Sequence, residues 1–126
     1  MQTSEAGRSD RGLPKNFMRP CVLLLLKESS AHGYDLLERI RAFGLKSDAG
    51  GMYRLLRALE REGFVRSWWE AGDNGHDRRT YALTAFGEKS LSAWGRSLAQ
   101  SRVVLEMFAR RLGRTRSGVR LLEPVT

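Results

Sequence analysis

The chain has 126 residues, and its 22 lysines and arginines against 14 acidic residues give a formal net charge of +8. This length suits one domain with an extension, and the basic excess, which lies mainly towards both ends, is typical of proteins that bind nucleic acid or another anionic surface. A lone cysteine, Cys21, excludes a disulfide within the chain, and the apolar run at 21–26 is too short to span a bilayer, so we expect a soluble, cytoplasmic protein without a membrane segment.

The N-terminal third predicts an arm and two helices. Residues 1–16 are polar with scattered basic side chains, which predicts a flexible arm that either has no role or touches phosphate. A first helix is expected from Arg19, with Pro20 tolerated at its first position, to Lys27 or Glu28. After a loop, the apolar spacing predicts a second helix from about Gly33 to Phe43.

The stretch from Asp48 to Gly63 predicts a third helix with two different faces. Asp48 is a suitable N-cap, and Gly63 suits a left-handed C-cap. The apolar side chains that share one stripe are Met52, Leu55, Leu56 and Leu59. The arginines that repeat the same spacing on another face are Arg54, Arg57 and Arg61. This pattern fits either an ordinary amphipathic helix or a helix that enters a DNA groove, with Gly50 and Gly51 leaving its first turn open to a ligand.

Behind this helix the apolar period changes from helical to two. Residues 65–70 and 78–83 then predict two strands joined by a polar turn, with Arg78 and Arg79 at the returning end. Three helices followed by a basic hairpin indicate a winged helix-turn-helix over residues 17–83. The predicted DNA-binding residues are Gly50, Gly51, Tyr53, Arg54, Arg57, Arg78 and Arg79.

A long final helix is expected over residues 84–112, with Thr84 as its N-cap. The side chains at alternating steps of three and four are Leu91, Trp94, Leu98, Ser101, Leu105, Phe108 and Leu112. Such a heptad seam predicts pairing with the same helix of a second subunit, although packing on the first helix is the alternative. Residues 113–126 predict a basic, disordered tail. The fold class is therefore mainly α with a small β-hairpin: a winged helix followed by a C-terminal dimerisation helix.

The assembled motifs resemble the PadR family of winged-helix transcriptional regulators. The matching stretches are Met18-Arg19-Pro20, AHGYDL at 31–36, GGMYRLL at 50–56, LEREGFV at 59–65, Trp69-Glu70 and RRTYALT at 78–84. The resemblance covers about residues 18–91 and implies a homodimeric repressor of the shorter subgroup, which binds double-stranded DNA at an inverted repeat. The family commonly has Thr at the position of Gly51 and Pro at that of Arg54, so Arg54 adds either a phosphate contact or a base contact. Trp68 replaces a residue that is usually polar.

The same seam suggests a further partner. The small Ser101 lies between Trp94 and Phe108, so these aromatics flank an under-packed gap in a symmetric dimer. The resemblance includes members that bind planar, apolar molecules between such helices. We therefore expect either an effector site formed by Trp94, Leu98 and Phe108, or a plain dimer core.

Other classes of protein fit less well. The chain has no nucleophile motif and no phosphate-binding loop, and His32 and His76 lie far apart, so an enzyme is not expected. One cysteine and two scattered histidines do not fill a tetrahedral site, so we expect no metal and no cofactor. The remaining alternative is a winged helix that serves as a protein-interaction module or binds nucleic acid without an operator of its own.

Overall fold

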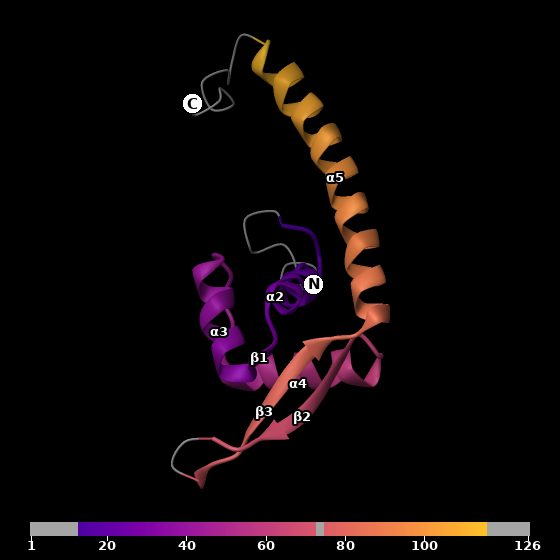
Figure 1. Ribbon diagram of the computed structural model, residues 1–126. Coiled ribbons are helices and arrows are strands. Elements are labelled where there is room, and N and C mark those ends of the chain that lie inside the picture. The colour runs from indigo at the N-terminus through magenta and orange to yellow at the C-terminus, as the bar shows by residue number, and fades with distance from the viewer. Residues whose placement is uncertain (1–12, 73–74, 116–126) are drawn as a thin grey trace. The chain divides into compact units, whose positions relative to one another are not determined.

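The computed structural model describes residues 13–72 and 75–115 and is mainly helical, with a small three-stranded antiparallel sheet (Figure 1). In chain order the elements are α2 (Met18–Glu28), β1 (Ala31–His32), α3 (Gly33–Ala42), α4 (Ala49–Arg61), β2 (Val65–Glu70), β3 (Arg78–Leu83) and α5 (Ala85–Gly113). The predicted helices and both predicted strands are confirmed, with ends that move by a residue or two.

Local chemistry explains where the helices begin and end. The Asp48 side chain accepts a hydrogen bond of 2.7 Å from the Gly51 N–H, so the predicted N-cap of α4 is confirmed. Gly44 and Gly63 have positive φ angles of 100° and 88°, the left-handed conformation that glycine adopts at the end of a helix. α2 begins at Met18 rather than Arg19, so Pro20 is its third residue, still within the first turn, where no helical N–H is needed.

The core lies between α2, α3, α4 and the sheet. α2 is buried on most sides, as its continuous apolar run predicts, while α3 and α4 each contribute one stripe. The largest fully buried side chains are Val22, Leu23, Leu36, Ile40, Met52, Leu56 and Leu59. This core is what presents the outer face of α4 to solvent.

The sheet has the order β1-β3-β2, with β3 in the centre (Figure 1). β2 and β3 pair in register from Val65 opposite Leu83 to Glu70 opposite Arg78. On the other side of β3, Ala31 lies opposite Tyr81, in a segment that the sequence predicted as a loop. That prediction was wrong because a strand of two residues has no periodicity and forms only when β3 offers it a free edge.

α5 begins directly after the sheet. The Thr84 hydroxyl accepts a hydrogen bond of 2.9 Å from the Gly87 N–H, which confirms the predicted N-cap. The same hydroxyl donates to the carbonyl of Gly63, at 2.7 Å, just beyond the end of α4. The chain divides into two compact units, residues 1–91 and 92–126, of which the first contains the winged helix and the start of α5. The predicted arm at 1–16 and tail at 113–126 fall largely outside the described residues.

Candidate nucleic-acid interface

α4 has a buried face and a basic face, as its sequence predicts. Met52, Leu56 and Leu59 are completely buried on one side. Arg54, Arg57 and Arg61 are exposed on the other side. A helix held by one apolar stripe projects its opposite face into solvent, so α4 offers its arginines to a partner.

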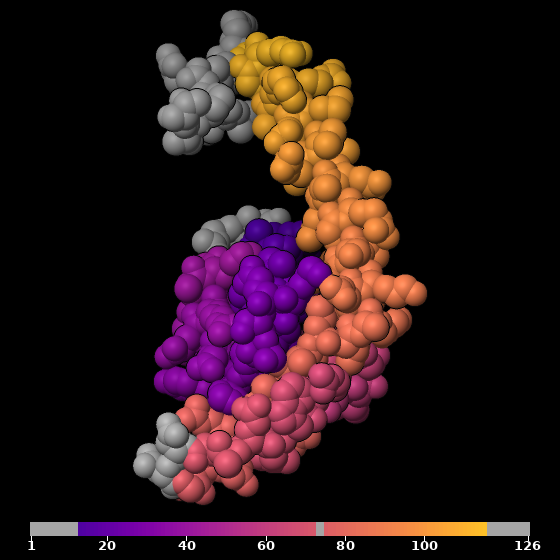
Figure 2. All heavy atoms as spheres, in the orientation of Figure 1, coloured from indigo at the N-terminus to yellow at the C-terminus, as the bar shows by residue number. Residues whose placement is uncertain are grey.

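A groove of about 790 Å³ lies between α4, the start of α3 and the hairpin. The basic and aromatic side chains that line it are His32 from β1, Tyr34 from α3, Tyr53, Arg57 and Arg61 from α4, and Trp69, Arg78, Arg79 and Tyr81 from the hairpin. Two carboxylates, Glu60 and Asp77, also line it. Figure 2 shows β2 and β3, in pink to salmon, at the surface of the winged helix beneath the indigo and purple helices. Cationic side chains from two elements therefore converge on one concave surface.

Close packing between α3 and α4 shapes one wall of this groove. A Cβ atom at Gly33 would lie only 2.5 Å from Cε1 of Tyr53, so the first residue of α3 must be glycine for Tyr53 to remain in place. Tyr81, on β3, is buried beside it, and this burial raises the pKa of its phenol. The Tyr81 hydroxyl therefore stays protonated and uncharged at neutral pH.

Arg79 is held across the groove by three contacts. Its Nε donates a hydrogen bond of 2.9 Å to the Ser67 hydroxyl, which itself donates to the Glu60 carboxylate at 2.9 Å. Nη2 of Arg79 lies 3.9 Å from Oε1 of Glu60, and the guanidinium lies 5.2 Å from the centroid of the Trp69 ring. Because Glu60 belongs to α4, Arg79 ties the hairpin to that helix.

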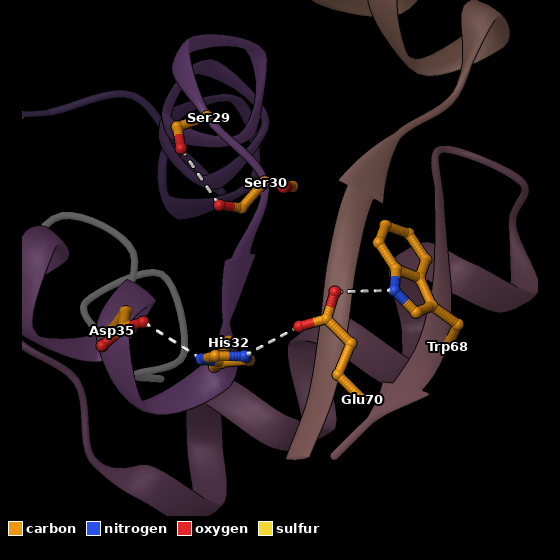
Figure 3. Close-up of polar contacts among 6 residues, drawn as sticks. All are labelled: Ser29, Ser30, His32, Asp35, Trp68 and Glu70. Atoms are coloured by element: carbon orange, nitrogen blue, oxygen red, sulfur yellow. Dashed lines mark hydrogen bonds and ion pairs between the residues drawn. The ribbon is translucent and has the colours of Figure 1, made fainter. Parts of the chain in front are cut away.

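A second polar cluster ties the start of α3 to the hairpin (Figure 3). His32 lies between two carboxylates, with Nδ1 at 3.3 Å from Asp35 and Nε2 at 3.6 Å from Glu70. Nδ1 makes no aligned hydrogen bond within the described residues, although the Asp35 carboxylate lies beside it. Trp68 Nε1 donates to Glu70 at 3.0 Å. This bond is the largest of the interactions, with Thr80 and His32, that lower the pKa of Glu70.

Comparison with known proteins identifies this arrangement. The model of the "Transcriptional regulator PadR-like family" matches residues 22–93, which is more than half of the chain. The chain belongs to the PadR-like family. Proteins of this family are transcriptional regulators and not enzymes. No curated protein matches the chain.

Solved structures share the fold of this PadR-like protein. A conserved protein of unknown function, described as a potential transcription factor, is 31% identical with a TM-score of 0.70, over 78% of this chain and 89% of its own. A Streptococcus transcriptional regulator is 27% identical with a TM-score of 0.62, over 71% and 90% of the two chains. Bacillus subtilis PadR, solved in complex with operator DNA, is 22% identical with a TM-score of 0.57, over 61% of this chain and 45% of its own.

The predicted DNA-binding residues of this PadR-like protein fall into two places. Tyr53, Arg57, Arg78 and Arg79 line the groove. Gly50, Gly51 and Arg54 lie together at the start of α4. Sequence reasoning missed Tyr34 and Trp69, which also line the groove and are each 62% exposed. The signal for them was an aromatic side chain directly beside a strand end or a helix start, a position that a core residue rarely takes.

The predicted interface residues all lie on α5, and their exposure differs along the helix. Leu91, Trp94 and Leu98 are half-buried, and Ser101 and Leu105 are exposed. Further along, Phe108 is 65% exposed and Leu112 is also exposed. Among the described residues, the last turns of α5 therefore present large apolar side chains to solvent.

The described part of the chain has neither a metal-binding cluster nor a membrane-spanning helix. Within residues 13–72 and 75–115, no group of three or more His, Cys, Asp or Glu side chains is placed to hold a metal ion. None of the helices in the same residues is long and apolar enough to cross a membrane.

Proposed function

We propose that this chain is a homodimeric repressor that binds double-stranded DNA at an inverted-repeat operator. The observation that carries the proposal is the groove in which arginines of α4 and of the hairpin converge. Arginine is the side chain best suited to both phosphate and guanine, because its fork of donors forms paired hydrogen bonds. The operator complex of Bacillus subtilis PadR supports DNA as the partner for this fold.

In this proposal α4 is the recognition helix. Its first turns, with Gly50, Gly51, Tyr53, Arg54 and Arg57, enter the major groove, as the N-terminal residues of a recognition helix commonly do. The hairpin follows the neighbouring backbone. Arg78 and Arg79 then contact phosphates, which give affinity and orientation rather than sequence preference.

The dimer rests on the seam of α5. Phe108 and Leu112 are exposed apolar side chains on a helix of 29 residues, and a second copy of this helix is the partner whose seam matches them. Two-fold symmetry then presents two α4 helices to DNA, which favours an inverted repeat. Repression, as opposed to activation, is inferred from the resemblance to PadR regulators. The cytoplasmic location remains a prediction.

An effector site is the second part of the proposal. Trp94, Leu98 and Phe108 lie on the same seam, where a planar apolar molecule would stack between two subunits. Such a molecule changes DNA affinity only if it binds one spacing of the two winged helices better than another. The alternative is that the three side chains fill a dimer core.

The test is DNA binding at a series of salt concentrations, measured by fluorescence anisotropy. We expect the logarithm of the association constant to fall linearly with that of salt, with a slope of about −0.9 per phosphate contact. Duplexes selected from the source genome should bind more tightly than unrelated duplexes at every salt concentration. A salt-dependent affinity that is equal for all sequences would favour the non-specific binder. No binding to any duplex would favour the protein-interaction module.

A further inference from the structure

The Arg54 side chain lies over the first turn of its own helix. Helical side chains lean towards the N-terminus, so a residue at position 54 covers positions 50 and 51. Both of these are glycine in this chain. A Cβ atom at Gly50 would lie 3.2 Å from Nη1 of Arg54, and one at Gly51 would lie 3.9 Å from Nη2. The pair of glycines therefore leaves the space in which the guanidinium lies.

The guanidinium of Arg54 is available to a partner. The two acids nearest in sequence are engaged elsewhere: Asp48 accepts a hydrogen bond from the Gly51 N–H as the N-cap of α4, and Glu60 accepts one from the Ser67 hydroxyl. Within the described residues Arg54 has no hydrogen bond or ion pair, in contrast to Arg79, which is held by Ser67 and Glu60. The positive end of the helix dipole lies at the start of α4 and disfavours a cation there. A hydrogen-bond acceptor beside Arg54 would therefore be stabilised both by the guanidinium and by the helix dipole.

We infer that Arg54, seated on Gly50 and Gly51, is the residue that reads guanine in each half of the operator. This inference rests on the proposed function, since it requires α4 to enter the major groove. Guanine presents two acceptors there, N7 and O6, and a guanidinium donates to both at once. Arg57 and Arg61 lie in the groove shared with the hairpin, next to phosphate-binding candidates. Arg54 does not line this protein groove. It lies near the start of α4, the end of the helix that enters the major groove of DNA in the proposed function.

The first experiment is selection of sequences from a random duplex library by the full chain. Wild type, Arg54→Ala and Arg54→Lys are compared, with Arg96→Ala as a control that removes one exposed arginine of α5 outside the predicted seam. We expect one guanine per half-site to be enriched by wild type and by Arg96→Ala. That guanine should lose its enrichment with Arg54→Ala, while the other selected positions stay the same.

The second experiment replaces that guanine by 7-deazaguanine, which lacks the N7 acceptor. The replacement should weaken wild type by roughly 5- to 150-fold, the cost of leaving one buried guanidinium donor without its acceptor while the contact with O6 remains. It should leave the affinity of Arg54→Ala nearly unchanged, because that variant makes no contact with N7. A phosphate contact of Arg54 would give a different result: a lower salt slope with no change at any base.

The role of the glycines beneath Arg54 is tested with Gly50→Leu, which places a side chain where the Arg54 guanidinium lies. The variant should remove the same guanine preference, and adding Arg54→Ala to it should cause no further loss. Leucine is a better helix former than glycine, so we expect the variant to fold, and circular dichroism checks this before binding is measured. A further loss in the double variant would show that Gly50 does not act through Arg54.

The outcomes separate this inference from the proposed function. If wild type and Arg54→Ala select the same guanines and respond equally to 7-deazaguanine, the inference is overturned and the proposed function stands. If wild type enriches no sequence at all, both are overturned.

Discussion

Arg79, at the start of β3, is held in a fixed position by its neighbours. Arg79 stacks on Trp69 and is bound to Ser67 and through it to Glu60. A side chain held in this way contributes its charge to the groove from a fixed position and loses less entropy when a phosphate binds.

Replacing Arg78 by alanine should weaken binding to every duplex by a similar factor. The reason is that a phosphate contact carries no sequence information. The salt slope should flatten by about one unit. Anisotropy at several salt concentrations measures both effects, with Arg96→Ala as the control for net charge. A loss confined to the selected operator would instead place Arg78 at a base.

Cys21 is 3% exposed in α2, and burial raises the pKa of its thiol from 9.0 to about 11. At neutral pH it should therefore react with a maleimide only after unfolding, because the thiolate is the nucleophile. The raised pKa of Cys21 also makes the stability of the fold depend on pH. Its contribution to stability is complete below about pH 9 and is lost as the pH rises towards about 11.

The comparison with Cys21→Ala isolates this effect from lysine and tyrosine titration. Thermal unfolding of both proteins between neutral and alkaline pH should show a steeper decline for wild type. Parallel curves, or rapid labelling of the folded protein, would mean that the thiol is accessible.

At the scale of elements, the junction between α3 and the hairpin depends on Glu70. Its pKa is lowered by the hydrogen bond from Trp68 and by interactions with Thr80 and His32. A lowered pKa means that the ionised carboxylate stabilises the fold. That stabilisation is present above the ordinary pKa of a glutamate and is lost as the pH falls through the folded value.

Replacing Trp68 by phenylalanine removes the indole N–H, so the pKa of Glu70 should rise towards its ordinary value. An NMR titration of the Glu70 side chain measures this, and the acid transition should begin at a higher pH than in wild type. Trp69→Phe is the matched control, since the neighbouring indole makes no bond to Glu70. Equal shifts in both variants would contradict the assignment.

The sequence predicted the individual helices and strands better than it predicted the contacts between them. Asp48, Gly63 and Thr84 act locally, within a turn of their own position, so each was recognisable as a helix boundary from sequence. β1 depends on β3, which lies about fifty residues further along the chain, and has no local pattern. The groove likewise joins side chains from α3, α4, β2 and β3, which lie far apart in sequence, so sequence patterns alone did not bring Tyr34 and Trp69 together.

At the scale of the whole molecule, the exposed apolar side chains of α5 lead to a prediction about the dimer. Phe108→Arg should cost the single chain little stability, since Phe108 is 65% exposed. In a symmetric dimer it would bring two like charges together in an apolar seam, at a cost of several kcal/mol. We expect a folded monomer by light scattering and a large loss of operator affinity.

Gln100→Arg is the matched control, because it adds the same charge to an exposed position of α5 outside the seam. This variant should remain a dimer. If Phe108→Arg also stays dimeric, the seam around Phe108 is not the subunit interface.

The first turn of α5 is tied to the winged helix by several contacts, and Leu91 packs against the same core. Gly87 packs so tightly that a Cβ atom would meet the Phe64 carbonyl at 2.1 Å, Lys27 pairs with Glu88, and the Thr84 hydroxyl caps the helix. Beyond Leu91 the helix belongs to the second compact unit. We therefore expect that a different helix grafted after Leu91 would leave the winged helix folded, and that it would change the spacing of the two winged helices in the proposed dimer.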